Sequence, residues 1–82
     1  MELKYIVTSH NDFAIFSPSI NHNDMARVLN GKPVGAGSCN IRQQADSNRV
    51  NVHCYGQSLS LHIGSREEDE EIINKNINHN YD

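Results

Sequence analysis

The clearest alternation of apolar and polar positions runs from Arg49 to Ile63, and it predicts a two-stranded hairpin. Gly56-Gln57 at its centre suits a two-residue type II′ turn, which places glycine first. In that register the inward pairs are all apolar: Cys54 with Leu59, Val52 with Leu61, and Val50 with Ile63. The outward pairs are Tyr55 with Ser58, His53 with Ser60, and Asn51 with His62. A slip of one residue would turn these polar side chains into the core, so the pattern favours this register.

The beginning of the chain predicts another hairpin, with strands at Leu3–Ser9 and Phe13–Ser17. Its apolar residues occupy positions on both faces of the strands. A strand that is buried on one face only shows a cleaner alternation of apolar and polar residues. We therefore expect this hairpin either to lie in the centre of the sheet or to meet another subunit with its second face.

A short helix is expected after Pro18, with Asn21 as its N-cap and Gly31 as a left-handed C-terminal cap. Its buried stripe is predicted to be Met25, Val28 and Leu29.

The range Val34–Gln43 predicts a third strand, in which Cys39 and Ile41 point inward. A last helix is expected to begin with Ser65 as N-cap and Glu68 completing a capping box. Its apolar stripe is formed by Ile72, Ile73 and Ile77.

The order ββαβββα predicts a small α+β protein with a mostly antiparallel five-stranded sheet covered by two helices. Residues 1–78 are expected to form a single compact domain and residues 79–82 a frayed tail. With 82 residues and 37% hydrophobic positions, the core is marginal, and association of identical subunits is the usual remedy. We therefore expect a homo-oligomer.

The composition and charge of the chain indicate its cellular environment and exclude some classes of partner. No apolar run is long enough to cross a bilayer and no basic-then-apolar leader follows Met1, so we expect a cytoplasmic protein with no membrane partner. The net charge is −3, five consecutive acids lie at Glu67–Glu71, and no basic cluster exists, which argues against direct binding of long nucleic acid. Eleven asparagines are typical of AT-rich coding sequence, as in phage or mobile-element genes.

Cys39 and Cys54 both fall at inward strand positions and are interpreted as small buried residues in a reducing compartment. A disulfide between neighbouring strands remains the alternative. No spacing of cysteine and histidine indicates a structural zinc site, and we expect no cofactor.

Three groups of residues are candidates for binding a ligand. The first is Gly64-Ser65-Arg66, where a helix N-terminus, the Ser65 hydroxyl and the Arg66 guanidinium would bind an anion. Simple helix capping is the alternative. The second group is the loop and strand that contain Lys32, Gly35, Gly37 and Ser38. Its two glycines would let backbone approach a phosphate, although a strand bulge or a large residue packed over the glycines explains them equally.

The third group is the outward face of the hairpin that begins at Arg49, with His53, Tyr55 and His62. The imidazoles would hydrogen-bond a ligand and Tyr55 would stack on a planar group. A solvated sheet face is the alternative, and a metal site ranks lowest because a third ligand is missing.

Catalysis has little support, because Cys54 and His53 are adjacent on a strand and therefore point to opposite faces. The sequence favours a small non-enzymatic oligomeric protein that captures or sequesters a phosphorylated or nucleotide-like molecule. The alternative is an acidic inhibitor or adaptor that blocks a basic, nucleic-acid-binding surface of a host protein through Glu67–Glu71.

Overall fold

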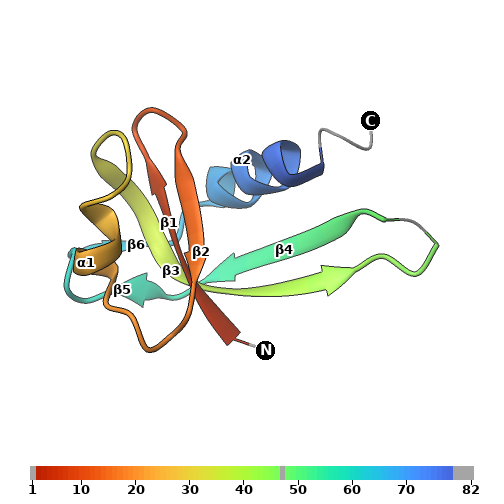
Figure 1. Ribbon diagram of the computed structural model, residues 1–82, viewed down its shortest axis with the longest axis horizontal. Helices are drawn as coiled ribbons and strands as arrows, with labels where there is room; N and C mark the ends of the chain where they lie inside the picture. The colour runs from red at the N-terminus through yellow and green to blue at the C-terminus, as the bar shows by residue number, and fades with distance from the viewer. Residues whose placement is uncertain (1, 47, 79–82) are drawn as a thin grey trace.

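The computed structural model describes residues 2–46 and 48–78 (Figure 1). The elements, in chain order, are β1 (Glu2–Thr8), β2 (Phe13–Phe16), α1 (His22–Ala26), β3 (Pro33–Gln43), β4 (Val50–Tyr55), β5 (Gln57–Ser58), β6 (Ile63–Gly64) and α2 (Glu67–Asn78). The fold is α+β, as predicted, but the strands form two sheets. One is an antiparallel four-stranded sheet of order β2-β1-β3-β4, and the other is the two-stranded pair β5-β6.

The predicted hairpin around Gly56-Gln57 is wrong. β4 pairs with β3 instead, over six residues from Ser38↔Tyr55 to Gln43↔Val50. In this pairing, Cys39 and Ile41 of β3 lie opposite the apolar residues of β4. A polar turn connects the two strands, and in it the Gln44 N–H donates to the Arg49 carbonyl at 3.0 Å. It also reverses the expected parity after Gly56, because Ser58 is buried whereas Leu59 is 76% exposed.

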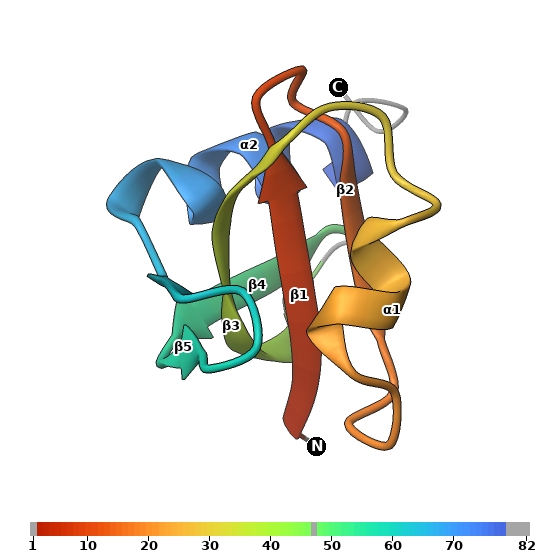
Figure 2. The same ribbon diagram turned by 90° about the vertical axis from the view of Figure 1, so that its left-hand side faces the viewer.

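The two-sided apolar pattern of the first hairpin is explained by the central position of β1. Tyr5 and Val7 face a cluster that also contains Ile72, Ile73 and Ile77 of α2. Ile6 faces the opposite cluster, in which α1 and the segment 57–64 take part. Figure 2 shows α1 and the turn around β5 in front of the sheet and α2 behind it. One chain therefore covers both sides of this hairpin, so its pattern is no longer an argument for assembly.

The first helix is shorter than its pattern suggests. α1 spans five residues, and the side chain of its N-cap residue Asn21 makes no capping hydrogen bond. Val28 lies beyond the helix and is 76% exposed, so its assignment to the buried stripe is wrong. Met25 and Leu29 do pack against the sheet, and Gly31 has the left-handed conformation expected of it, with φ 101°.

The first turn of α1 carries a buried histidine. The Nε2 atom of His22 lies 2.9 Å from the carbonyl oxygen of Gly37, so Nε2 donates its proton to that oxygen. Burial lowers the pKa of His22 below its ordinary value of 6.5. The unfolded chain therefore binds a proton that the folded chain rejects as the pH falls below 6.5.

We expect the free energy of unfolding to be largest above that pH and to decrease as the solution is acidified toward the lowered pKa of His22. Thermal unfolding followed by circular dichroism between pH 7.5 and pH 5.5 measures this effect. The variant His22→Gln should show a weaker dependence, whereas His10→Gln, at an exposed position, should retain the slope of the wild type. Equal slopes in all three proteins would contradict the assignment.

Neither helix within residues 2–46 and 48–78 is long and apolar enough to cross a membrane. The predicted frayed tail, residues 79–82, lies outside the described residues.

Candidate functional site

The pairing of β3 with β4 creates an open polar surface that we call the polar sheet face. It consists of Ser38, Asn40 and Arg42 from β3 and Asn51, His53 and Tyr55 from β4. Residues opposite one another in an antiparallel pair point to the same side, so these six side chains form three adjacent rows. The other half of this face is apolar and lies under α1 and segment 57–64. Figure 1 shows the β3–β4 hairpin projecting beyond this covered half.

Four of these side chains line a hollow of about 230 Å³: Asn40, Arg42, Asn51 and His53. Arg42 forms no ion pair with any residue in 2–46 or 48–78, so its guanidinium is available to an anion. The two amides offer both donors and acceptors. A guanidinium between amides suits a phosphorylated or carboxylated molecule.

An aromatic pair borders the hollow. The rings of His53 and Tyr55 are stacked, with centroids 5.8 Å apart and planes inclined by 24°. Desolvation and the nearby Glu2 carboxylate raise the pKa of Tyr55. The stacked pair can act as a platform for a planar ligand.

A carboxylate of α2 contacts the His53 ring and orients it. The Oε2 atom of Glu70 in α2 lies 3.3 Å from the Nδ1 atom of His53. This contact favours the tautomer with the proton on Nδ1. The Nε2 atom of the same ring is then an acceptor for a ligand group.

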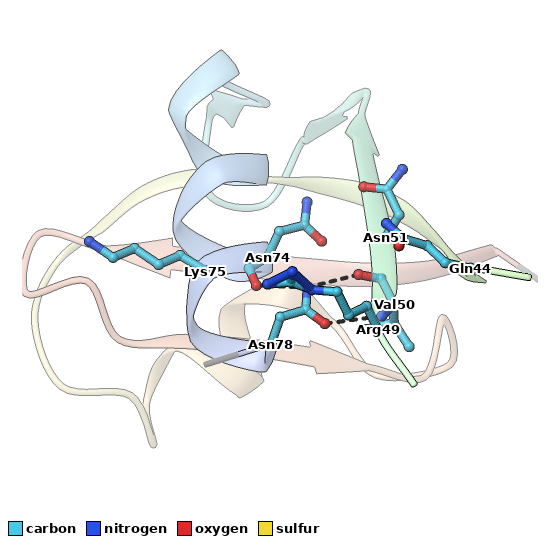
Figure 3. A pocket seen from close by; sticks show the side chains of 7 residues that line it. All are labelled: Gln44, Arg49, Val50, Asn51, Asn74, Lys75 and Asn78. Atoms are coloured by element: carbon cyan, nitrogen blue, oxygen red, sulfur yellow. Dashed lines mark hydrogen bonds between the residues drawn. The ribbon is translucent and has the colours of Figure 1, made fainter. Parts of the chain in front are cut away.

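A second hollow of about 310 Å³ lies beside the first and shares Asn51 with it (Figure 3). Its other lining residues are Gln44, Arg49, Val50, Asn74, Lys75 and Asn78. Figure 3 shows that the Asn78 amide is already bonded to the backbone of Val50. The Asn74 amide is likewise bonded to Val52, so this hollow is built around side chains that hold α2 to β4.

Arg66 is placed elsewhere, in a network around the buried carboxylate of Asp69. Asp69 is 0% exposed and accepts hydrogen bonds from the Arg66 N–H at 2.9 Å and from the Tyr5 hydroxyl at 2.6 Å. The Arg66 guanidinium adds contacts of 2.9 Å and 2.7 Å. Burial and the hydrogen bond to Asp69 raise the pKa of Tyr5 far above its ordinary value. The anion at this helix N-terminus is thus a side chain of the protein itself.

This network corrects the predicted capping box. α2 begins at Glu67, so Arg66 rather than Ser65 occupies the N-cap position, and Asp69 rather than Glu68 reaches back to the capping N–H. Ser65 instead lies near the Tyr5 hydroxyl.

The glycines of the second candidate group serve close packing. A Cβ atom on Gly35 would overlap the Asp69 carboxylate, and one on Gly37 would overlap the carbonyl oxygen of Tyr55. Lys32 precedes β3, with its backbone bonded to Ser9, whereas Asn40 and Arg42 lie toward the other end of that strand. Lys32 and Gly35 therefore lie apart from the polar sheet face, whereas Gly37 borders it through its packing against the Tyr55 carbonyl.

The structure brings together Ser38, His53 and Tyr55 among the predicted site residues. His62 lies between β5 and β6, beside a separate shallow hollow of about 280 Å³. Sequence reasoning missed Asn40 and Arg42, because it paired β4 with segment 57–63 instead of β3. The sequence of β3 could have indicated them, because the polar residues 38, 40 and 42 alternate with Cys39 and Ile41. They therefore lie on the face of the strand opposite to those two apolar residues.

Only part of the acidic run is exposed. Asp69 is buried and Glu70 faces His53, which leaves Glu67, Glu68 and Glu71 in contact with solvent. Among residues 2–46 and 48–78, no group of three His, Cys, Asp or Glu side chains is arranged to hold a metal ion.

Comparison of the chain with models of protein families, with curated proteins and with solved structures gave no match.

Proposed function

We propose that this protein is a non-enzymatic binding protein that captures a small phosphorylated, nucleotide-like molecule on its polar sheet face. The observation that carries the proposal is the hollow around Arg42, which is bordered by the stacked rings of His53 and Tyr55. An available guanidinium and an aromatic platform side by side match the two ends of a nucleotide.

Each part of the ligand has a partner in this arrangement. Arg42 would form paired hydrogen bonds with phosphate oxygens, since its planar fork fits that geometry. The amides of Asn40 and Asn51 would bond the sugar or the edge of the base. The base itself would stack on Tyr55, an interaction worth about 1–3 kcal/mol.

A second copy of the chain would complete the site. A hollow of about 230 Å³ is smaller than a ligand pocket of ~300–1,000 Å³, and it is open on one side. A homo-oligomer in which two polar sheet faces approach one another would enclose the ligand. Such an assembly would also increase the surface that this short chain buries and so stabilise it.

Capture without turnover is favoured by the chemistry of this face. Cys39 and Cys54 lie on the opposite side of the sheet, buried under α2. The Nδ1 atom of His53 is engaged by Glu70. A lone imidazole beside an open hollow orders a ligand but does not exclude water from a reaction.

The second candidate function, an acidic inhibitor or adaptor, is favoured by the three exposed acids of α2. It is weaker than the sequence suggested, because Asp69 is used internally and Glu70 pairs with His53. Charge reversal at Glu67, Glu68 and Glu71 tests it through a salt-dependent loss of a protein partner.

Isothermal titration calorimetry against a panel of linear and cyclic nucleotides tests the main proposal. Arg42→Gln should weaken binding of the preferred nucleotide by about 10- to 100-fold, the value of a charged hydrogen bond. Tyr55→Leu should weaken it by a similar factor. Arg27→Gln is the matched control, since Arg27 is an exposed arginine at the end of α1.

Unchanged affinity in Arg42→Gln would contradict the site, and loss of affinity in Arg27→Gln would show that only net charge matters. An equal loss of nucleotide affinity in Lys32→Ala would indicate that the ligand binds at the loop that precedes β3.

A further inference from the structure

The two cysteines face one another across neighbouring strands. Cys39 of β3 and Cys54 of β4 are direct partners in the register, and both are free thiols. Cys39 is 0% exposed and Cys54 is 6% exposed, on the side of the sheet that packs against α2.

The bonds between α2 and β4 identify the kind of pair they form. Val50 and Val52 direct their backbone N–H and C=O groups to the amides of Asn78 and Asn74, away from β3. The N–H and C=O groups of successive residues in a strand point to opposite edges, so those of Cys54 point away from β3, as those of Val52 do. Cys39 and Cys54 are therefore a non-hydrogen-bonded pair, the class in which Cα atoms are ~4.5 Å apart and side chains are closest.

That separation is within the range a disulfide accepts, which begins at ~4.4 Å between Cα atoms. A bond between the two sulfurs therefore requires rotation of side chains and little movement of β3 or β4. The Sγ atom of Cys39 is 4.0 Å from the Lys4 carbonyl, a weak contact that such a rotation would give up.

We propose that Cys39 and Cys54 are a redox modification site that closes to an intramolecular disulfide when the folded protein meets a peroxide. The Cys54 thiolate attacks one peroxide oxygen, the O–O bond breaks, and the hydroxide that leaves takes up a proton as water. The Cys39 thiol then attacks the sulfenic sulfur of Cys54, the S–S bond forms, and the departing hydroxide takes the thiol proton as a second water. The two thiols lose two electrons and the peroxide gains them.

The surroundings of the pair set the rate of this step. Burial raises the pKa of Cys39 to about 11. Burial, together with the nearby Cys39, Glu70 and Asp69, raises the pKa of Cys54 to about 12. The thiolate is scarce at neutral pH, so oxidation is slow there and should accelerate ~10-fold for each pH unit between 7 and 9.

The bond would tie together the strands that carry the polar sheet face. The pair Cys39↔Cys54 lies between the pairs Ser38↔Tyr55 and Asn40↔His53, which point to the opposite side. Oxidation would therefore restrain the hairpin directly beneath the stacked rings.

Mass spectrometry after oxidation tests the proposal. Folded protein is treated with hydrogen peroxide, quenched with catalase, then unfolded in the presence of a maleimide. We expect a monomer lighter by about 2 Da that takes up no maleimide, and full recovery of two reactive thiols after dithiothreitol. Neither Cys54→Ala nor Cys39→Ala should show the loss of about 2 Da, because each variant lacks one of the two sulfurs that form the bond.

The same peroxide treatment of the protein unfolded in urea is the control for reagent strength. Two labelled thiols in the folded sample after prolonged treatment at pH 9, under conditions that oxidise the unfolded one, would overturn the proposal. Sulfinic acid on either cysteine, or a disulfide between two chains, would overturn it as well.

Discussion

Asp69→Ala is expected to lower the free energy of unfolding by about 3–5 kcal/mol, because the buried carboxylate is the shared acceptor of a hydrogen-bond network. The carboxylate is fully buried, and its loss would leave the hydroxyl of Tyr5 and the N–H of Arg66 without their acceptor. The space above Gly35 would become a cavity, since the carboxylate lies directly over that glycine. For an 82-residue protein this is a large part of the total stability.

Urea denaturation followed by circular dichroism measures the effect, with Glu68→Ala as the control. Glu68 is the neighbouring acid, exposed and 3.7 Å from the Arg66 guanidinium, so its removal should change stability by less than ~1 kcal/mol. Similar losses in both variants would mean that the acids act through the helix dipole alone.

The double variant Asn74→Ala, Asn78→Ala is expected to lower the free energy of unfolding by about 2–4 kcal/mol, because four hydrogen bonds to the edge of β4 disappear. Each amide donates to one backbone carbonyl of β4 and accepts from the N–H of the same residue, as a neighbouring strand would. α2 thus protects a strand edge that would otherwise pair with another chain. We expect the double variant to self-associate as well as to unfold more easily.

Asn76→Ala is the matched control, since Asn76 lies on the same helix, is exposed, and bonds to the Ile72 carbonyl within α2. Urea unfolding and sedimentation velocity together measure stability and association. A double variant as stable as Asn76→Ala would contradict the role of the two amides in covering β4.

Within β4, the face on which each side chain lies was predictable from the sequence, whereas the partner strand was not. Both the predicted and the observed pairing turn Val52 and Cys54 inward and His53 and Tyr55 outward, but beyond Gly56 the prediction was wrong, since Ser58 is buried and Leu59 is exposed. A two-residue turn at Gly56 is a local signal, whereas the pairing of β4 with β3 depends on packing across the polar turn that begins at Gln44.

The burial of Asp69 could not be predicted, because one acid among five looks like surface charge. Its position depends on Tyr5, 64 residues away in the sequence, and on the space left above Gly35. The candidate site was incomplete for the same reason: Asn40 and Arg42 join His53 only through the pairing of β3 with β4.

Native mass spectrometry of the protein as purified, before and after denaturing extraction, tests the central claim most directly. We predict a homo-oligomer whose mass exceeds that of its subunits by a phosphorylated molecule in fixed ratio, and Arg42→Gln should release that molecule while Arg27→Gln retains it. Wild-type protein that is ligand-free as purified and stays so when titrated with linear and cyclic nucleotides would contradict capture on the polar sheet face. The acidic surface of α2 would then be the first place to look for a protein partner.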